Sequence, residues 1–504
     1  MQVQPILQQD WIAKWALYSP NKVAVREAET GRVLTYGQLD RLSDALCAYL
    51  QEQYGIKMGD HIALLAENNL EYIALFAAMQ RMGFVLVPLN YRLAAAEIDY
   101  LLQDAAPKLI ICEAKFEPQL KAGHELAKVA HYMPWSTLSD FCEQAKDEVH
   151  PAFLLQPVGA DHPAFILYTS GTTGFPKGAI YSHKMLFWNS INTAMSLIVN
   201  TESRTVNVMP PFHTGGWNVL TTPFLHHGGY TVLMRKFDPE RVLQLLQEER
   251  ATLFMGVPTI LKMMAEAPGF EAAKFSDLYY LIVGGEPMPI PLIEKWDKKG
   301  VPVRQGYGMT EVGPNLFSLH QDDAIRKKGS IGRPNYYVQT RIVDAQGRDT
   351  AQGEAGELWL KGPMVTPGYW QNEAATQKSM TDGWFHTGDM VRADEGHYFF
   401  VVDRIKNMYI SGGENVYPAE VERVLQAHPD VAEAAVIGVP DEKWGESGRA
   451  FVVLKAGAAA VEVEALRTYC KAHLAKFKVP REVVFLPELP KNDTGKINRT
   501  ALKG

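Results

Sequence analysis

The segment best suited to chemistry is a loop rich in glycine and hydroxyl side chains. The stretch AFILYTSGTTGFPKG, from Ala164 to Gly178, places an apolar strand directly before this loop, and Lys177 stands at its end. Small residues allow backbone N–H groups and hydroxyls to close around phosphate oxygens, and a lysine adds a positive charge. The spacing differs from the common GxxxxGK[ST] phosphate loop. A flexible surface turn is the plain alternative, but the preceding buried strand favours phosphate binding.

Seven further motifs, rich in glycine, proline and charged side chains, follow along the chain: PPFHTGG (210–216), VGGEPMP (283–289), QGYGMTE (305–311), GELWLKGPMVTPGYW (356–370), WFHTGD (384–389), VVDRIKNMYISGGENVYPAEVE (401–422) and PKNDTGKINR (490–499). Together with YTSGTTGFPKG they resemble the signature of the adenylate-forming superfamily. That superfamily comprises acyl- and aryl-CoA synthetases, peptide-synthetase adenylation domains and beetle luciferases. The resemblance covers nearly the whole chain and is strongest to bacterial medium- to long-chain fatty acyl-CoA synthetases.

The resemblance implies a reaction in two steps. A carboxylate first joins the α-phosphate of ATP and releases pyrophosphate, and the acyl group then passes to CoA with release of AMP. The first step brings two anions together, so it needs a phosphate cradle, a divalent cation and a positive charge at the reacting atoms. By resemblance, the ATP and AMP site comprises Thr169, Ser170, Gly171, Thr172, Thr173, Gly174, Lys177, Gly285, Glu286, Pro287, Gln305, Gly306, Tyr307, Gly308, Met309, Thr310, Asp389, Arg404 and Lys496.

Individual roles within this site also follow from the resemblance. Glu311 and the Thr169 hydroxyl are expected to bind Mg²⁺, an ion that prefers hard oxygen ligands. Tyr307 is expected to lie against adenine, with the turn that holds Gly285, Glu286 and Pro287 along its edge. A carboxylate accepts two hydrogen bonds at once, which suits Asp389 to both ribose hydroxyls. Arg404 is expected to contact ribose and phosphate.

Two residues are expected to act on the carboxylate itself. Lys496 matches the lysine that bridges the carboxylate and the α-phosphate, although a charged segment near a chain end is usually solvated. His213 matches a histidine that orients the carboxylate or gates its pocket, although a lone histidine is more often structural. With His213, the expected acyl pocket comprises Gly215, Gly216 and Val312.

The acid and the acceptor are less closely defined by the sequence. The stretches beside His213 and Glu311 carry no further charge, which favours an apolar acid, a medium- or long-chain fatty acid. An aryl- or hydroxycinnamoyl-CoA ligase is the alternative, as is an adenylation enzyme that loads a carrier protein. A binding protein that has lost catalysis is disfavoured, because Lys177, Glu311 and Lys496 are all present.

Resemblance to acyl-CoA synthetases also suggests where CoA binds. Glycine has no side chain, so Gly412 and Gly413 would let a narrow pantetheine arm pass close to the backbone. Trp444, in GVPDEKWGE, is expected to flank the pantetheine, and Lys478 could meet a CoA phosphate. Some relatives have an arginine at the position of Val479, so this chain departs from them in the residues that would contact the nucleotide end of CoA.

The elements that must position these residues alternate along the first four hundred positions. Residues 61–66, 84–89 and 108–113 read as buried strands, and 69–83 as a helix that ends at Gly83. This alternation indicates α/β layers around a largely parallel sheet, which binds ligands beyond the carboxyl ends of its strands. A β-rich portion begins near residue 354. We therefore predict a large N-terminal domain (1–403) and a smaller mobile α+β domain (404–504), with a hinge at 403–406 that contains Lys406.

Bulk composition sets wider limits. A chain of 504 residues is expected to form two or more domains, and its net charge of −7 argues against a nucleic-acid binder. No apolar run is long enough for a transmembrane segment, and the first twenty residues lack the features of a secretory signal. The cysteines are too scattered for a metal cluster or a disulfide framework, which favours the cytoplasm: Cys47, Cys112, Cys142 and Cys470. The expected partners are an acid, ATP and CoA, and a homodimer is one oligomeric state open to the chain.

Overall fold

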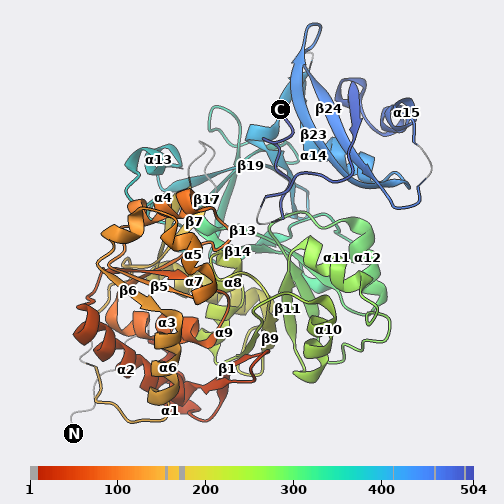
Figure 1. Ribbon diagram of the computed structural model, residues 1–504. Helices are drawn as coiled ribbons and strands as arrows, with labels where there is room; N and C mark the ends of the chain where they lie inside the picture. The colour runs from red at the N-terminus through yellow and green to blue at the C-terminus, as the bar shows by residue number, and fades with distance from the viewer. Residues whose placement is uncertain are drawn as a thin grey trace. The chain divides into compact units, whose positions relative to one another are not determined.

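The computed structural model describes residues 10–153, 157–169, 176–411, 414–458, 461–492 and 495–503. Contacts divide the chain into two compact units (Figure 1). The first unit comprises Met1–Gln339 and Leu360–Phe385, and the second comprises Thr340–Trp359 and His386–Gly504. The predicted hinge at 403–406 falls inside the second unit, and both the hinge and the domain boundary there remain predictions.

The first sheet of the first unit carries the strand that precedes the glycine-rich loop. Its six strands run in the order β6-β5-β3-β4-β7-β8, and all neighbours are parallel except β7 and β8. The bounds are β3 His61–Leu65, β4 Val85–Pro88, β5 Leu109–Cys112, β6 His131–Pro134, β7 Pro163–Thr169 and β8 Lys177–Ser182. The predicted strands near 61, 84 and 108 are confirmed as β3, β4 and β5.

Helices cover both faces of this sheet, because successive side chains of a strand point to opposite sides. Ile62 and Leu64 pack in one core, whereas Ala63 and Leu65 pack in another. The first core is closed by α1 Trp11–Tyr18, α2 Tyr36–Tyr54, α3 Leu70–Met82 and α6 Trp135–Ala145, and the second by α4 Ala95–Ala105 and α5 Glu117–Lys121. The predicted helix 69–83 is confirmed: the Asn69 side chain caps α3, and Gly83 ends it with a left-handed φ of 76°.

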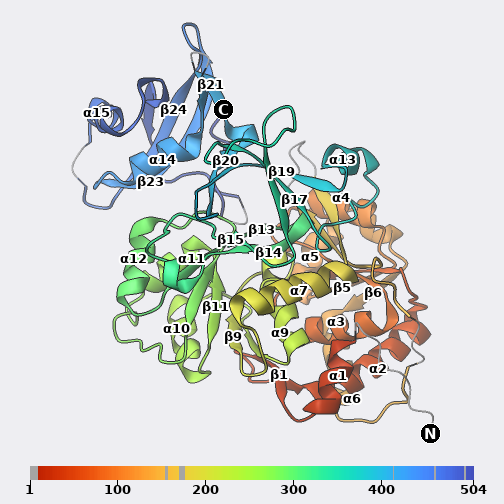
Figure 2. The ribbon, with the colours of Figure 1, turned by 180° about the vertical axis from the view of Figure 1, so that it is seen from behind.

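A second sheet of this unit runs in the order β11-β12-β13-β14-β15, with β11, β12 and β13 parallel. Its strands are β11 Leu253–Gly256, β12 Tyr280–Val283, β13 Val303–Met309, β14 Gly313–Ser318 and β15 Arg333–Pro334. One face packs on α10 Pro239–Glu248, α11 Pro258–Glu266 and α12 Ile290–Lys298. On the other side α7 His183–Leu197 lies along β14, where Asn189 Oδ1 accepts a hydrogen bond from the Asn315 N–H at 3.3 Å (Figure 2).

The remaining elements of the first unit are short. A third sheet runs β2-β1-β10-β9, with β1 Val23–Glu27, β2 Val33–Thr35, β9 Arg204–Asn207 and β10 Tyr230–Leu233. Beside it are α8 Thr214–Trp217 and α9 Thr221–His227, and later in the chain come α13 Glu373–Lys378 and β18 Met380–Thr381. Among the described residues, none of the helices combines the length and the apolar character that crossing a membrane requires.

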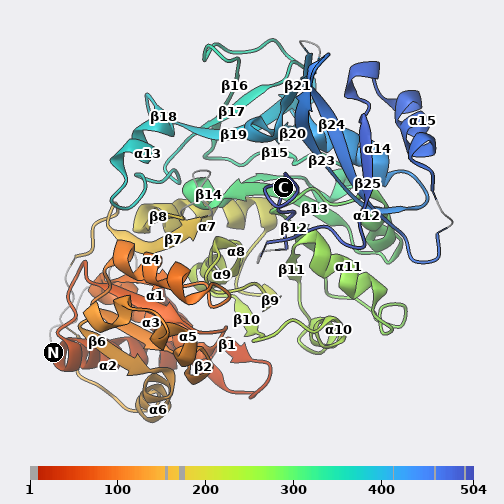
Figure 3. The same ribbon diagram turned by 45° about the horizontal axis from the view of Figure 1, so that its top comes forward.

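The second unit contains most of the β-rich portion, which the prediction assigned to the large N-terminal domain, together with the predicted α+β fold. Its β-rich strands are β16 Gln339–Val343, β17 Gly356–Lys361, β19 Trp384–Ala393 and β20 Phe399–Arg404. A second sheet has the order β22-β21-β24-β23, with β25 parallel to β24 (Figure 3). Its elements are β21 Tyr409–Ser411, β22 Glu414–Val416, α14 Pro418–Gln426, β23 Val431–Asp441, β24 Gly445–Leu454, α15 Val463–His473 and β25 Glu482–Phe485. Side chains of α14 and α15 share one core with β23 and β24, which confirms the predicted fold class of a large α/β region followed by a smaller α+β region.

Candidate active site

The two ends of the glycine-rich loop are held by an antiparallel hairpin. Thr169 ends β7 and Lys177 begins β8, and the two residues stand opposite each other in the register. Both side chains are half-buried. The residues predicted to bind phosphate between them, Ser170, Gly171, Thr172, Thr173 and Gly174, lie outside the described residues. The strand pairing therefore places the predicted hydroxyl ligand and the predicted lysine at one edge of the sheet.

Glu311 is brought to the same edge from the second sheet. It lies in a 3-10 turn, Thr310–Val312, directly after β13, and only 9% of its surface is exposed. Its Oε1 atom accepts a hydrogen bond from the Thr169 hydroxyl at 3.3 Å. A hydroxyl and a carboxylate are oxygen donors of the kind Mg²⁺ prefers, with ATP phosphates to complete the shell. Across the described residues, no three His, Cys, Asp or Glu side chains gather into a site that could hold a metal. Binding of Mg²⁺ by Glu311 and Thr169 remains a prediction.

Tyr369 joins this pair, and sequence reasoning missed it. The Tyr369 hydroxyl donates to the same Oε1 atom of Glu311, at 3.0 Å, and the Lys177 ammonium lies 5.2 Å from the centre of the tyrosine ring. Burial, and then the charge of Glu311, raises the pKa of the Tyr369 hydroxyl, so it remains a donor at neutral pH. The only sequence signal was its place in the motif GELWLKGPMVTPGYW.

Gln305 braces the turn that was predicted to border adenine. Its side-chain Oε1 accepts from the Met288 N–H at 3.1 Å, and its Nε2 donates to the Glu286 carbonyl at 3.2 Å. This turn includes Pro287 and contains Gly285, whose φ of 84° is one that glycine adopts without strain. Gln305 is itself buried, so the structure shows a bracing contact for it, and its contact with the nucleotide remains a prediction.

Tyr307, Met309 and Thr310 occupy the partly exposed end of β13 and the turn after it. The Tyr307 ring meets Phe317 of β14 edge to face, with 5.6 Å between ring centres. This contact holds the ring against the strand from one side. Its predicted stacking on adenine remains a prediction.

The two glycines that flank Tyr307 differ in what surrounds them. A Cβ atom on Gly308 would stand 2.2 Å from the Pro314 carbonyl oxygen, whereas one on Gly306 would meet its nearest atoms at 3.6 Å. We expect Gly308→Ala to destabilise the protein by about 1–3 kcal/mol and to weaken ATP binding, because β13 must shift away from β14. Gly306→Ala is the matched control for packing and should leave the stability nearly unchanged. Thermal melts and ATP titrations of both variants check this, and equal stability of the two would contradict it.

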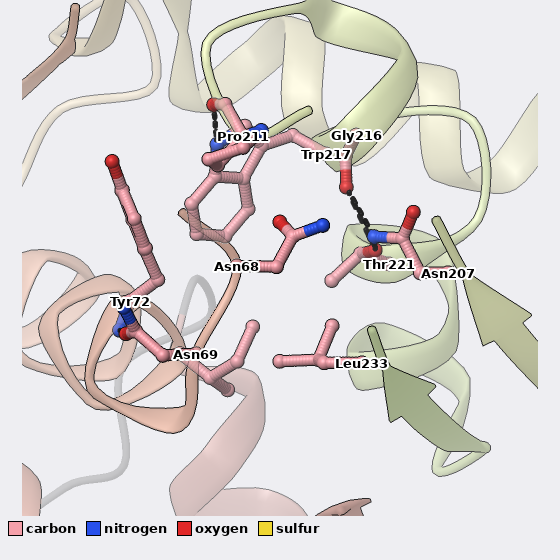
Figure 4. Close-up of a pocket in the computed structure, with 10 residues that line it drawn as sticks. Asn68, Asn69, Tyr72, Asn207, Pro211, Gly216, Trp217, Thr221 and Leu233 are labelled. Carbon is pink, nitrogen blue, oxygen red and sulfur yellow. Dashed lines mark hydrogen bonds between the residues drawn. The ribbon is translucent and has the colours of Figure 1, made fainter. Parts of the chain in front are cut away.

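The segment that carries His213 is held by buried amide and indole groups (Figure 4). Asn68 Nδ2 donates to the Met209 carbonyl at 2.8 Å, Asn207 Nδ2 to Gly216 at 2.9 Å, and Trp217 Nε1 to Pro211 at 2.7 Å. The cavity that these residues line has a volume of about 10 Å³, room for about one water molecule. It is a small gap behind the loop, too small for the chain of an acid.

The predicted acyl-pocket residues occupy different surroundings. His213 precedes α8, with its ring 4.5 Å from that of Phe212. A Cβ atom on Gly215 would meet the methyl groups of Met209 and Met255 at 3.4 and 4.0 Å, so an apolar wall lies beside it. Gly216 is closely packed, since a Cβ atom there would stand 2.2 Å from the Pro210 carbonyl oxygen. Val312 is fully buried.

In the second unit, Asp389, which is predicted to bind the ribose hydroxyls, is paired with Arg404, which is predicted to contact ribose and phosphate. Asp389 on β19 and Arg404 on β20 stand opposite each other, and Arg404 Nε lies 2.5 Å from Asp389 Oδ1. Asp389 is 2% exposed, whereas the Arg404 side chain is exposed. Glu357 of β17 accepts from the Gly388 N–H at 3.0 Å, which fixes the backbone next to the carboxylate. The structure thus brings these two predicted residues together.

Lys406, the predicted hinge residue, lies in a cluster of positive charge within the second unit. Loss of hydration lowers the pKa of Lys406. The positive charges of Arg404, Arg499 and Lys496 lower this pKa further, whereas the negative charge of Asp389 raises it. The side chain is exposed, so solvent screens these charges. Its role as a hinge remains a prediction.

Lys496 lies in a short turn near the end of the chain. Its N–H donates to Asn492 Oδ1 at 2.9 Å, and its carbonyl accepts from the Asn492 N–H at 2.8 Å. Lys491 and Ile497 form a β-bridge around this turn. The Lys496 side chain is exposed, and its predicted contact with the carboxylate and the α-phosphate remains a prediction.

An ion pair that the sequence did not reveal anchors the segment behind this turn. Arg499 donates to both carboxylate oxygens of Glu422, at 2.7 and 2.8 Å, and the Val436 N–H donates to Glu422 as well. Burial raises the pKa of Glu422, and Arg499 acts in the opposite direction. The C-terminal segment is therefore tied to α14 and β23.

Arg499→Met should destabilise the second unit by about 3 kcal/mol, because it leaves the buried Glu422 carboxylate without its cation. Replacing Glu422 by leucine in the same protein should recover part of that loss. Arg449 pairs with Glu482 at 2.5 Å on the exposed face of the same unit, so Arg449→Met is the control and should cost less than about 1 kcal/mol. Denaturant melts compare the three proteins, and an Arg499→Met variant as stable as the control would contradict this account.

The predicted CoA residues are only partly placed. Gly412 and Gly413 lie outside the described residues. Trp444, between β23 and β24, is 38% exposed, with the Lys443 ammonium 5.1 Å from its ring centre. Lys478 binds both carboxylate oxygens of Glu420 at 2.8 Å, so a CoA phosphate would compete with that carboxylate. CoA contacts at these residues remain predictions.

Comparison with known proteins identifies the class. The profile of AMP-binding enzymes matches residues 12–370, and that of the AMP-binding enzyme C-terminal domain matches residues 420–496. A feruloyl-CoA synthase from an Amycolatopsis species is 38% identical over 490 residues, which is 97% of this chain and 96% of that protein. The long-chain-fatty-acid–CoA ligase FadD13 of Mycobacterium tuberculosis is 37% identical over 494 residues, which is 97% of this chain and 96% of that protein.

Solved structures agree with these sequence matches. The o-succinylbenzoate coenzyme A synthetase MenE of Bacillus subtilis, in complex with ATP and a magnesium ion, superposes with a TM-score of 0.85 at 30% identity. The match covers 98% of this chain and 99% of that one. This chain belongs to the family of AMP-binding enzymes. It is an AMP-forming acid–CoA ligase that uses ATP, Mg²⁺ and CoA, which confirms the predicted superfamily, enzyme class and cosubstrates.

Proposed function

We propose that this ligase activates an acid with an apolar tail, a medium- or long-chain fatty acid, through an acyl-adenylate. The observation that carries the proposal is the apolar wall beside Gly215, where the methyl groups of Met209 and Met255 approach. Both methionines pack in a hydrophobic core cluster that also includes Val219 and Leu220. Methionine is flexible and polarisable, so such a wall can adapt to an alkyl chain.

In this proposal the chain's own residues divide the work of adenylation. His213 orients the carboxylate, and Lys177 and Lys496 offset negative charge on the reacting groups. A carboxylate oxygen forms a bond to the α-phosphorus of ATP, and the bond from that phosphorus to the pyrophosphate oxygen breaks. Mg²⁺, when bound by Glu311 and Thr169, neutralises phosphate charge. In the second step the CoA thiol releases its proton to solvent and its sulfur bonds to the acyl carbon, while the bond from that carbon to the AMP phosphate oxygen breaks and AMP leaves.

An aromatic acid is the second candidate, and a specific observation favours it. The feruloyl-CoA synthase matches this chain at 38% identity, as closely as the fatty acid ligase at 37%. A flat apolar acid would suit the same wall. Loading of a carrier protein in place of CoA is a further alternative.

We also propose the cytoplasm as the compartment of this protein, because its four cysteines are buried and form no disulfide.

A panel of acids tests the proposal. Decanoate, palmitate, ferulate, malonate, succinate and 2-succinylbenzoate are assayed for CoA-dependent AMP release, with a holo-carrier protein as the competing acceptor. We expect the highest kcat/KM with a fatty acid and with CoA. A higher kcat/KM for ferulate would select the aromatic alternative. Preference for any of the three dicarboxylates would show that the wall beside Gly215 does not define the substrate.

A further inference from the structure

Tyr369 connects three residues that the sequence places in the active site. Its hydroxyl lies 3.0 Å from Glu311 Oε1, and the Thr169 hydroxyl lies 3.3 Å from the same oxygen. Its ring faces the Lys177 ammonium at 5.2 Å. Two hydroxyl donors on a single carboxylate oxygen restrict the rotation of that carboxylate.

The backbone around Tyr369 is itself fixed, so the hydroxyl comes from a rigid support. Residues 368–370 run alongside β8: the Ile180 N–H donates to the Gly368 carbonyl at 3.1 Å, and the Trp370 N–H donates to the Gly178 carbonyl at 2.7 Å. The Tyr369 N–H donates to Thr376 Oγ1 at 2.9 Å. This segment also reaches the Glu311 backbone, whose carbonyl accepts from the Thr366 N–H at 2.7 Å.

We propose that Tyr369 is a positioning residue for the metal-bound nucleotide. Its hydroxyl orients the Glu311 carboxylate for Mg²⁺, and its ring holds the Lys177 ammonium at the start of β8. The proposal rests on the assignment of Glu311 and Thr169 as the magnesium ligands. Groups that hydrogen-bond to a ligating carboxylate fix its direction, and their loss commonly lowers metal affinity by about 10- to 100-fold. A cation over an aromatic face adds a smaller attraction.

Two variants separate the hydroxyl from the ring. Tyr369→Phe removes the hydroxyl and keeps the ring, so the dissociation constant for Mg²⁺ in the presence of a non-hydrolysable ATP analogue should rise about tenfold. Binding of the analogue in EDTA should stay within about twofold, because the ring still faces Lys177. Tyr369→Leu removes both groups, and it should weaken analogue binding in EDTA as well. Calorimetric titration of the full chain measures each constant without any acid or turnover.

Controls keep the result specific to the site. Tyr336 is 69% exposed, and Tyr336→Phe should match the wild type in every titration. Tyr369→His restores a hydrogen-bond donor near the carboxylate and should recover part of the Mg²⁺ affinity. This variant also serves as the test if the Tyr369→Phe protein has a lowered melting temperature. An unchanged Mg²⁺ constant in a folded Tyr369→Phe protein would overturn the proposal and leave the ligase assignment standing. A wild-type protein that binds no Mg²⁺ with the analogue would overturn both.

Discussion

Replacing Lys496 by alanine is expected to slow adenylation by about 100- to 1,000-fold, because removing a group that stabilises charge in the transition state costs about 3–4 kcal/mol. The same variant should still convert a supplied acyl-adenylate and CoA into thioester. Lys496 lies near the carboxyl terminus, whereas the predicted CoA residues Gly412 and Gly413 follow the predicted hinge. We expect the two half-reactions to use different residues of the small domain.

The two half-reactions are measured separately to test this division. Acid-dependent exchange of labelled pyrophosphate into ATP reports adenylation, and thioester formation from the synthetic adenylate reports the second step. Lys503→Ala is the control, since Lys503 is an exposed lysine of the same terminal segment. The Lys496 side chain is exposed too, so its loss should not disturb folding. Equal loss of both steps in a folded Lys496→Ala protein would show that the division of labour is wrong.

Replacing Glu311 by glutamine is expected to lower adenylation by about 100-fold or more. Glutamine keeps the length of the side chain and an oxygen that accepts from the Thr169 and Tyr369 hydroxyls. The change therefore removes the negative charge that Mg²⁺ requires while it preserves the packing around a nearly buried side chain.

Initial rates of pyrophosphate release are recorded over a range of Mg²⁺ concentrations. The Glu311→Gln rate should rise with Mg²⁺ beyond the concentration that saturates the wild type. Glu271→Gln, at an exposed position of the same unit, should follow the wild type. If Glu311→Gln instead saturates at the wild-type Mg²⁺ concentration with an unchanged rate, Glu311 is not a magnesium ligand.

Local patterns were sufficient to predict much of the fold. Buried strands and the helix end at Gly83 depend on neighbours in sequence, so the strand at 61–66 and the helix at 69–83 could be predicted without a structure. The active-site motifs were equally readable, because glycines, hydroxyls and charges occur together in short stretches. The structure brings Thr169, Lys177 and Glu311 together at one edge, although Glu311 is 142 residues from Thr169.

Contacts between distant segments were not predictable in this way. Tyr369 reaches Glu311 only because residues 368–370 pair with β8. The hydrophobic periodicity of the sequence does not predict such a pairing. Arg499 and Glu422 are 77 residues apart, and each by itself reads as a solvated charge. Lys478 was assigned to a CoA phosphate in the comparison with acyl-CoA synthetases, and its contact with Glu420 depends on the fold. These are tertiary interactions that a single sequence does not encode locally.

The most direct test of the central claim is the identity of the products. The protein is incubated with ATP, Mg²⁺, decanoate and CoA, and phosphorus NMR with chromatography of the thioester follows all species. We predict one AMP and one pyrophosphate for each acyl-CoA, together with acid-dependent pyrophosphate exchange when CoA is omitted. Formation of ADP and inorganic phosphate in place of AMP and pyrophosphate would contradict the account.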